Sequence, residues 1–217
     1  MTLKQQIAGA LADMRGSSPL IHCITNYVTA GDTANMLLAA GASPIMADDP
    51  SESAEITALA QGLTLNLGTP SGSRVEAMLR SGAEANRRGI PVVFDPVGAG
   101  CSGFRRNSAG EILRRVRLTA IRGNLSEISY LAGFESRENG VDSSETRITA
   151  AEAAQTAAKK LGCVCAVTGE RDVISDGSRT VTILSGTPLL KKVTGAGCMT
   201  SALCAACLLY TSPSPRD

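Results

Sequence analysis

A glycine-rich turn near the carboxyl end of the chain has the residue types of an anion-binding site. The segment reads Val-Thr-Gly-Ala-Gly-Cys over residues 193–198 and opens an apolar helix that we expect to begin at about residue 198. Glycine lets backbone N–H groups turn toward one point, and a helix N-terminus adds partial positive charge. Gly195, Ala196 and Gly197 are therefore predicted to form an anion hole suited to a phosphoryl group in transfer. The alternative is a turn capped by a small buried cysteine, because a free cysteine is usually buried.

Cys198 stands at the first turn of this helix, beside the point where those amide groups converge. The partial positive charge of a helix N-terminus favours the thiolate form of a cysteine placed there. A thiolate can act as a general base that takes a proton from an alcohol. The segment therefore favours transfer of a phosphoryl group to an alcohol.

A second motif, Arg-Gly-Asn-Leu-Ser-Glu over residues 122–127, follows an apolar run that predicts a strand over 118–121. Asn124 and Glu127 have the spacing of a capping box, so the motif can simply start a helix. The same spacing places both side chains at one helix end, where they can hold Mg²⁺, directly or through waters, beside nucleotide phosphates. Arg122 can clamp a phosphate. The residues alone leave both interpretations open.

A third motif begins with Asp95 at the end of a predicted strand, where a carboxylate is well placed for a metal ion or water. The residues at 98–103 match the G-x-G-x-x-G pattern, which gives a nicotinamide-dependent oxidoreductase as an alternative. A single match is weak, and here Asp95 and Pro96 separate the strand from the glycines. The G-x-x-x-x-G-K-[ST] pattern is absent from the sequence, so ATP would be bound without a P-loop.

Other reactive residues have simpler interpretations. His22 is the sole histidine, and we expect a core or strand-end side chain with a hydrogen-bond partner rather than part of a Ser–His–Asp triad. Cys163 and Cys165 alternate on one strand face, which favours core packing. Cys204 and Cys207 form a C-x-x-C pattern without a second ligand pair, so a zinc site is not expected.

The elements that position these motifs alternate between short apolar runs and helical patterns. This alternation predicts an α/β fold with a mostly parallel sheet and helices on both faces, in which ligands bind at the carboxyl ends of the strands. Gly162 is predicted to end a helix, and Asp176-Gly177 predicts a hairpin. The predicted strands are residues 19–24, 44–47, 63–67, 91–95, 118–121, 163–168, 173–175 and 180–184; the predicted helices are 32–40, 52–61, 71–88, 103–116, 125–132, 149–161 and the segment from about 198; residues 133–147 are predicted to form a surface loop.

The composition narrows the function classes further. The 217 residues suit one α/β domain, and a hydrophobic content of 43% is enough for a sizeable core. The net charge of +1, with charged residues interspersed, gives no electrostatic footprint for nucleic acid or an anionic membrane surface. The N-terminal residues lack the pattern of a signal peptide, so we expect a cytoplasmic protein whose seven cysteines are reduced thiols.

Six motifs, in order along the chain, resemble those of the hydroxyethylthiazole kinases. They are HCITNYVT at 22–29, GASPIMADDP at 41–50, DPVGAG at 95–100, RGNLSEI at 122–128, AVTGE at 166–170 and VTGAGCM at 193–199. The resemblance extends to about residue 206. It implies a ribokinase-like three-layer α/β/α fold without a lid domain. It also implies transfer of the ATP γ-phosphate to the hydroxyethyl group of 4-methyl-5-(2-hydroxyethyl)thiazole, in thiamin biosynthesis and salvage, by a homotrimer with the thiazole near a subunit boundary.

The resemblance also implies roles for single residues. Cys198 occupies the position where related ribokinase-like enzymes carry a catalytic aspartate. The other implied roles are contact with the thiazole for Met46 and Gly195, contact with ATP for Arg122 and Thr168, and organisation of Mg²⁺ for Asn124 and Glu127, with Asp95 assisting.

The sequence departs from the family pattern at two places. Many members have threonine where this chain has Ala196, which removes a hydroxyl but keeps the backbone N–H. The segment TSPSPRD at 211–217 contains two Ser-Pro steps that cannot continue a helix. We therefore expect a kinase domain over residues 1–206 that is incomplete at its C-terminus, followed by a non-native tail over 207–217.

Three further alternatives are set against the thiazole kinase. Another ribokinase-like kinase can act on a hydroxymethylpyrimidine or a sugar, although Cys198 and the Pro-Ile-Met segment at 44–46 favour the thiazole enzyme. A nicotinamide-dependent enzyme predicts protection by NAD(P) and none by Mg-ATP. A truncated fragment can also fold and bind without turning over substrate.

Overall fold

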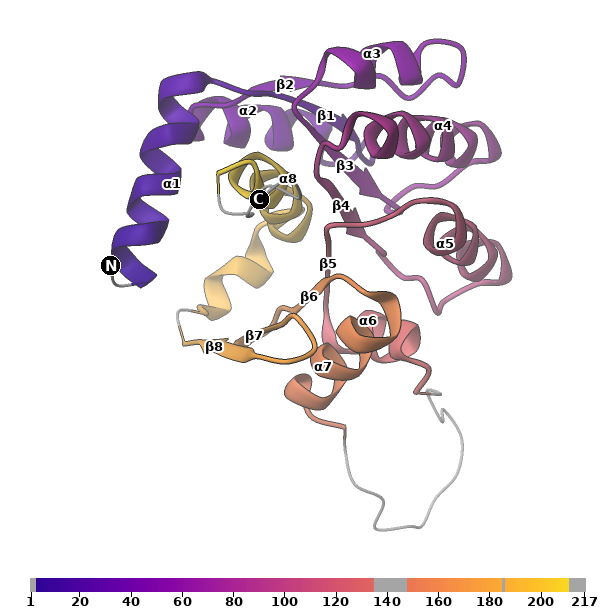
Figure 1. The fold of residues 1–217 in the computed structure, drawn as a ribbon. Helices are drawn as coiled ribbons and strands as arrows, with labels where there is room; N and C mark the ends of the chain where they lie inside the picture. The colour runs from indigo at the N-terminus through magenta and orange to yellow at the C-terminus, as the bar shows by residue number, and fades with distance from the viewer. Residues whose placement is uncertain (1–2, 135–147, 185, 211–217) are drawn as a thin grey trace.

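The computed structural model describes residues 3–134, 148–184 and 186–210, and within them one sheet of eight strands lies at the centre (Figure 1). The strand order is β2-β1-β3-β4-β5-β6-β7-β8; neighbours from β2 to β6 pair in parallel, and β7 and β8 add antiparallel. The strands are β1 (Leu20–Ile24), β2 (Ser43–Ile45), β3 (Gly62–Asn66), β4 (Val92–Asp95), β5 (Ala120–Gly123), β6 (Val164–Val167), β7 (Asp172–Ser175) and β8 (Thr180–Ile183).

Helices cover both faces of this sheet and complete three layers (Figure 1). One face carries α1 (Leu3–Ser17), α2 (Ala30–Ala40) and α8 (Ala196–Leu208). The other carries α3 (Ser53–Leu59), α4 (Gly72–Arg88), α5 (Gly103–Arg115), α6 (Leu125–Ala132) and α7 (Ala150–Leu161). A short 3₁₀ helix, η1 (Pro188–Lys192), leads from β8 to α8. The predicted three-layer α/β/α architecture with a mostly parallel sheet is confirmed.

Alternating side chains on the strands divide the interior into two clusters. On β4, Val92 and Phe94 pack under α4 to α7, whereas Val93 packs on the side of α8. Strands covered on both faces need apolar residues at consecutive positions, as in the run Val92–Phe94. Because the alternation continues to the last residue, Asp95 faces the same side as Val93 and thus faces α8. The two-residue alternation of side chains therefore points the polar residue at the end of β4 toward α8.

Helix ends follow the local signals in the sequence. Thr149 and Glu152 form a capping box at the start of α7, and Gly162 ends that helix in the left-handed region with φ +66°. Asp176 and Gly177 connect β7 to β8, as predicted. Gly41 and Gly89 close α2 and α4 in the same left-handed conformation.

Two parts of the secondary structure differ from the prediction. The strand predicted over 118–121 is β5 at Ala120–Gly123, so Arg122 lies inside the strand rather than after it. The apolar run was misleading because Leu118 is buried in the loop ahead of the strand. Helices α1 and η1 were not predicted. The surface loop predicted over 133–147 and the Ser-Pro segment lie almost wholly outside the described residues.

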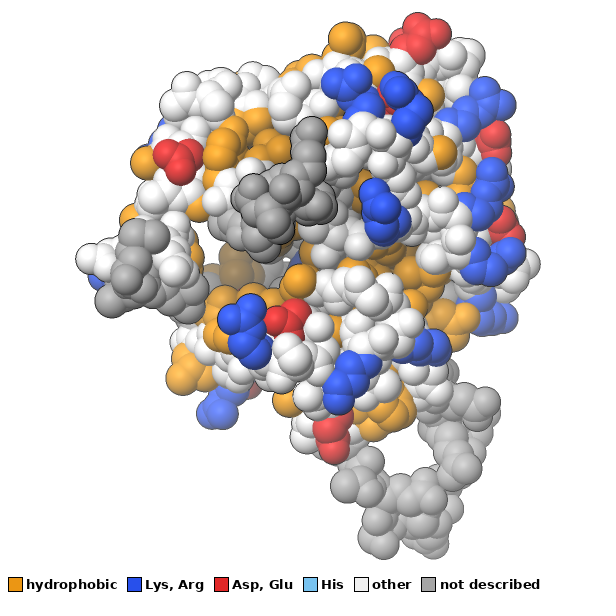
Figure 2. All heavy atoms as spheres, in the orientation of Figure 1, with side chains coloured by type: hydrophobic (Ala, Val, Ile, Leu, Met, Phe, Trp, Pro, Cys, Tyr) orange, Lys and Arg blue, Asp and Glu red, His pale blue; other side chains and the backbone are white. Residues whose placement is uncertain are grey.

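Side chains of both charges are interspersed over the surface, with Lys and Arg the more numerous on the face that Figure 2 shows. On α4, Arg80 pairs with Glu76 at 2.8 Å and Arg87 with Glu84 at 2.6 Å. Such pairs within one turn of a surface helix add little to stability. In the part of the chain that the structure describes, no helix has the length and apolar character needed to cross a membrane.

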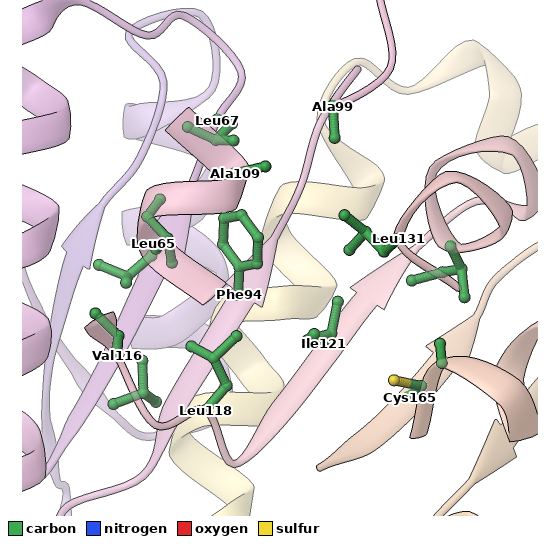
Figure 3. Packing of buried hydrophobic residues seen from close by; sticks show 14 of the residues in the cluster. Leu65, Leu67, Phe94, Ala99, Ala109, Val116, Leu118, Ile121, Leu131 and Cys165 are labelled. Atoms are coloured by element: carbon green, nitrogen blue, oxygen red, sulfur yellow. The ribbon is translucent and has the colours of Figure 1, made fainter. Parts of the chain in front are cut away.

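Phe94 provides a test of the larger core cluster. Its ring lies between Leu65 of β3 and Ile121 of β5, its register neighbours, and is fully buried (Figure 3). Phe94→Ala should lower the free energy of unfolding by about 3–5 kcal/mol, because a cavity replaces the ring. Phe104→Ala on α5, where the ring is 48% exposed, is the matched control and should cost less than about 1 kcal/mol. Urea denaturation measures both, and equal losses would contradict this packing.

Candidate functional site

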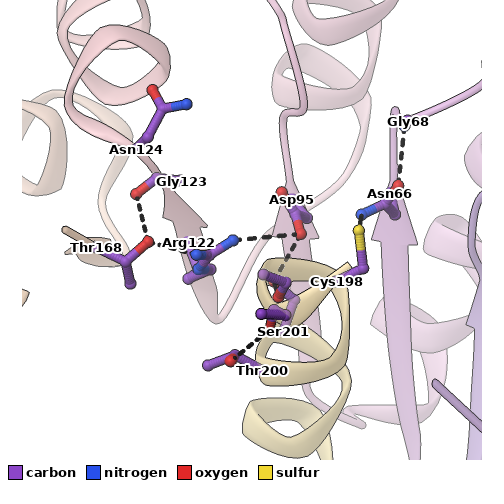
Figure 4. Close-up of polar contacts among 12 residues, drawn as sticks. Asn66, Gly68, Asp95, Arg122, Gly123, Asn124, Thr168, Cys198, Thr200 and Ser201 are labelled. Atoms are coloured by element: carbon purple, nitrogen blue, oxygen red, sulfur yellow. Dashed lines mark hydrogen bonds and ion pairs between the residues drawn. The ribbon is translucent and has the colours of Figure 1, made fainter. Parts of the chain in front are cut away.

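Three adjacent strands end in polar side chains that face α8. Asn66 ends β3, Asp95 ends β4, and Arg122 lies one residue before the end of β5 (Figure 4). Asn66 and Asp95 are direct register partners. The carboxyl ends of parallel strands form one edge of the sheet, and the first turn of α8 lies against it. The site is therefore built where the sheet edge meets a helix N-terminus.

Asp95 is the buried charge of this site. Its side chain is 1% exposed, its Oδ2 accepts a 2.8 Å hydrogen bond from Ser201 of α8, and Arg122 Nη1 lies 3.7 Å from the same oxygen. Burial raises the pKa of Asp95 to about 6, although Arg122 and the Ser201 hydroxyl act in the opposite direction. Within the described chain, Asp95 Oδ1 has no hydrogen-bond partner.

Arg122 is held from two sides. Its guanidinium bonds the hydroxyl of Thr168, which follows β6 and itself donates to the carbonyl of Gly123 at 3.3 Å. On the other side lies the backbone of α8: a Cβ on Gly197 would be 2.3 Å from Arg122 Nη1. Glycine is thus required at position 197 for the guanidinium to lie against the helix N-terminus. Arg122 and Thr168, predicted together from resemblance, are in contact.

Gly195 makes the turn into α8. It is the N-cap, with φ +76°, and a Cβ there would lie 2.3 Å from the Thr29 side chain. Both the left-handed backbone and the close approach require glycine. Ala196 is the first residue of the helix, so the N–H groups of the first turn have no carbonyl partner within the helix. This arrangement can receive an anion.

Cys198 lies in that first turn, and two amide side chains point at its sulfur. Asn26 Nδ2 and Asn66 Nδ2 each lie 3.2 Å from Cys198 Sγ (Figure 4 shows the Asn66 contact). Neither asparagine was predicted as a site residue. Both follow or end strands that were predicted correctly, so a polar residue at a strand's carboxyl end was the available signal. Ser201, one turn after Cys198, was missed for lack of any motif.

Asn124 and Glu127 form the capping box that their spacing predicts. Asn124 Oδ1 accepts from the Glu127 N–H at 2.9 Å, and Glu127 Oε2 accepts from the Asn124 N–H at 2.8 Å. Glu127 Oε1 also accepts from the N–H of Gly98 at 2.9 Å. Glu127 therefore ties the loop after β4 to the start of α6.

Met46 follows β2 at the edge of the sheet and is 38% exposed. Its loop is anchored by Asp48, which accepts from Arg74 Nε at 2.7 Å, and Arg74 also donates to the Thr69 carbonyl at 2.9 Å. Within the described residues, no hydrogen bond joins Met46 to the other predicted site residues. The structure places it beside the strand that leads to Asn26, because β2 pairs with β1.

The remaining candidates are structural. His22 is fully buried, with ring nitrogens 2.8 Å from the Thr57 hydroxyl and from the Ala47 carbonyl. Cys165 is buried in the larger core cluster and Cys163 packs against it. Burial raises the pKa of Cys204 to about 11. The described residues contain no group of three His, Cys, Asp or Glu side chains arranged to hold a metal ion.

The fold and this site define a class of proteins. A ribokinase-like superfamily protein from Enterococcus faecalis V583 has the same fold, with a TM-score of 0.63 at 12% identity over 92% of this chain and 74% of that one. The chain is thus an α/β protein of the ribokinase-like fold.

Closer comparisons identify the family. The chain belongs to the hydroxyethylthiazole kinase family, whose sequence profile matches residues 11–213. Hydroxyethylthiazole kinase from Ruminiclostridium cellulolyticum is 52% identical over 202 residues, which is 92% of this chain and 74% of the relative. The structure of a hydroxyethylthiazole kinase protein from Pyrococcus horikoshii OT3 matches with a TM-score of 0.86 at 40% identity, over 96% of this chain and 78% of that one.

The buried carboxyl of Asp95 predicts a pH dependence of stability. Its pKa is higher in the folded than in the unfolded chain, so its stabilising contribution is present below about pH 4 and lost as the pH rises through about 6. As the pH rises through this window, the unfolding free energy of the wild type should fall by about 3 kcal/mol more than that of Asp95→Asn. Urea denaturation in EDTA measures it, with Asp13→Asn as the exposed control. Parallel curves for the wild type and Asp95→Asn would contradict the prediction.

Proposed function

We propose that this chain transfers the γ-phosphate of ATP to the hydroxyethyl group of 4-methyl-5-(2-hydroxyethyl)thiazole, a step of thiamin biosynthesis and salvage. It is an alcohol phosphotransferase in the family to which the chain belongs. The observation that carries the proposal is the contact of the α8 N-terminus with the polar strand ends, with Cys198 in its first turn. Phosphoryl transfer requires mainly positioning and charge stabilisation, and both are provided there.

Cys198 acts as the general base in this proposal. Its sulfur takes the proton of the substrate hydroxyl, the alkoxide oxygen forms a bond to the γ-phosphorus, and the bond from that phosphorus to the bridging oxygen breaks. ADP leaves with the electron pair of that bond. The first-turn N–H groups of α8 and the guanidinium of Arg122 stabilise the charge on the phosphoryl oxygens. Gly195 and Met46 contact the thiazole, and Arg122 and Thr168 contact ATP.

Mg²⁺ is proposed as the metal that accompanies ATP. The unpartnered oxygen of Asp95 fits such a cation, and Mg²⁺ usually keeps several waters and takes one or two carboxylates. Asn124 and Glu127 already cap α6, so they would contribute their remaining acceptor capacity through water. When bound, Mg²⁺ neutralises phosphate charge. Asp95, Asn124 and Glu127 would hold the metal at this edge of the sheet, directly or through its waters.

A homotrimer with the thiazole near a subunit boundary is proposed for the assembly. Apolar side chains around the end of β1 support it: Tyr27 is 73% exposed and Val28 is 58% exposed. A cytoplasmic location is proposed as well, in keeping with seven cysteines that all lie in the described residues and form no disulfide there. The domain limits of 1–206, with a non-native tail from 207, stay a prediction; Cys207 and Leu208 form the end of α8 and pack against the smaller core cluster.

The activity is tested by incubating the chain with Mg-ATP and the hydroxyethylthiazole, beside a hydroxymethylpyrimidine, and by detecting the phosphate ester by mass spectrometry. Thiazole phosphate as the single product is the expected result. Phosphorylation of the pyrimidine alone would overturn the substrate assignment. Absence of both products, with no protection by Mg-ATP against thermal unfolding, would overturn the kinase proposal for this chain.

Loss of the Cys198 sulfur should reduce turnover and leave the fold intact. Cys198→Ala should lower kcat by about 10²–10⁴-fold, the usual contribution of a general base. The chain should still fold, with some loss of thermal stability, because Cys198 is only partly buried but accepts hydrogen bonds from two buried amides. Cys101→Ala, at an exposed cysteine, is the matched control and should turn over normally. A near-normal rate in Cys198→Ala would contradict the base role.

A further inference from the structure

Two asparagines from different strand ends meet at Cys198, and each is oriented by a backbone donor that cannot turn. Asn66 Oδ1 accepts from the N–H of Gly68 at 2.8 Å, and Asn26 Oδ1 accepts from the N–H of Thr29 at 3.1 Å. A backbone N–H can only donate, so the oxygen of each amide must face it. The two NH₂ groups therefore point toward Cys198 Sγ, and neither amide can be reversed without losing a bond.

The two amides also fix each other. Asn26 Nδ2 donates to Asn66 Oδ1 at 3.1 Å and to Cys198 Sγ at 3.2 Å, so both of its hydrogens are used. The Thr29 hydroxyl gives Asn26 Oδ1 a further donor at 3.1 Å. Asn26 is 4% exposed and Asn66 is 1% exposed. Buried amides held by this many bonds keep one geometry, since any other would leave polar groups unpaired.

The hydrogen bonds at Cys198 Sγ all run in one direction, toward the sulfur. Across the described residues, Cys198 Sγ accepts from two N–H groups and donates to none. The two amide groups therefore leave the sulfur as an acceptor, which is the direction of hydrogen bonding that a base requires. In the thiolate form that the proposed base mechanism uses, the sulfur has a further lone pair for a third donor, the hydroxyl of an alcohol.

We propose that Asn26 and Asn66 are positioning residues that hold Cys198 Sγ as a hydrogen-bond acceptor, ready to take the alcohol proton. This proposal rests on the function proposed above, in which Cys198 is the base. The positive end of α8 acts on the same sulfur from the helix side. The pair gives a cysteine the role that an acidic side chain would otherwise hold at this position.

Alkylation of Cys198 by iodoacetamide tests the proposal without any kinase substrate. Asn66→Asp keeps the oxygen that Gly68 needs but turns a carboxylate oxygen toward the sulfur. Asn26→Asp does the same from the end of β1 and keeps the bonds of Thr29. At pH 7.5, each change should slow carbamidomethylation of Cys198 by about tenfold or more, because a nearby negative charge opposes the thiolate.

The controls separate this effect from misfolding and from a general charge effect. Peptide mapping gives the rate at exposed Cys101 in the same molecule, and this rate should not change. Asn107→Asp adds the same charge on the exposed side of α5 and should alkylate Cys198 like the wild type. Circular dichroism checks the fold of each variant. Because the change is made at two positions, the proposal is still tested if one of the two variants fails to fold.

Alkylation of Cys198 within about twofold of the wild type, in whichever of the two variants is folded, would overturn the proposal. Turnover gives a second readout: kcat should fall in both variants while the KM for ATP changes little, because Arg122 and Thr168, the side chains proposed to contact ATP, bond each other and neither asparagine. If the variants slow alkylation but the wild type shows no kinase activity, the role of the two asparagines stands and the proposed function is rejected.

Discussion

The structure depends on how the N-terminus of α8 is seated on the carboxyl ends of β3, β4 and β5. Two side chains one turn apart on α8 make the contact: Cys198 meets Asn66, and Ser201 donates to Asp95. Two glycines permit the approach, since Gly195 takes a left-handed turn against Thr29 and Gly197 leaves room for Arg122. Charge stabilisation and the proposed base are therefore brought together by one helix and one sheet edge.

The same contact between α8 and the sheet edge places a carboxylate and a guanidinium in a largely buried setting. Asp95 and Arg122 are only 3.7 Å apart, yet one oxygen of Asp95 and the Nε of Arg122 lack hydrogen-bond partners within the described chain. Buried polar groups without partners are costly, and functional sites are where proteins retain them. The apolar clusters on both faces of the sheet, with Phe94 at the centre of the larger one, offset this cost.

Much of the fold could be predicted from the sequence because its signals are local. Apolar runs, the Asp176-Gly177 turn and the glycine at the end of α7 each act over a few residues, and the structure confirms them. The capping box of Asn124 and Glu127 was equally visible. The further bond from the Gly98 N–H to Glu127 could not be predicted, because it joins segments that only the sheet order brings together.

The polar contacts of the site were harder to predict for the same reason. Cys198 was singled out by the glycines that precede it, but its partners lie 172 and 132 residues away in the chain. Asp95 and Arg122 were recognised from their motifs, whereas Ser201 sits inside an apolar helix with no pattern around it. The misplaced strand start at 118 shows the limit of apolar runs, since Leu118 is buried without belonging to β5.

The contact of α8 with the strand ends is tested most directly by a double-mutant cycle on kcat that combines Ser201→Ala with Cys198→Ala. If the Ser201 hydrogen bond to Asp95 serves to place Cys198, the serine change should lower kcat in the wild type and cost little once the sulfur is gone. Strong non-additivity is therefore the predicted result. Equal costs of Ser201→Ala in both backgrounds would show that the two side chains act independently and would contradict the account.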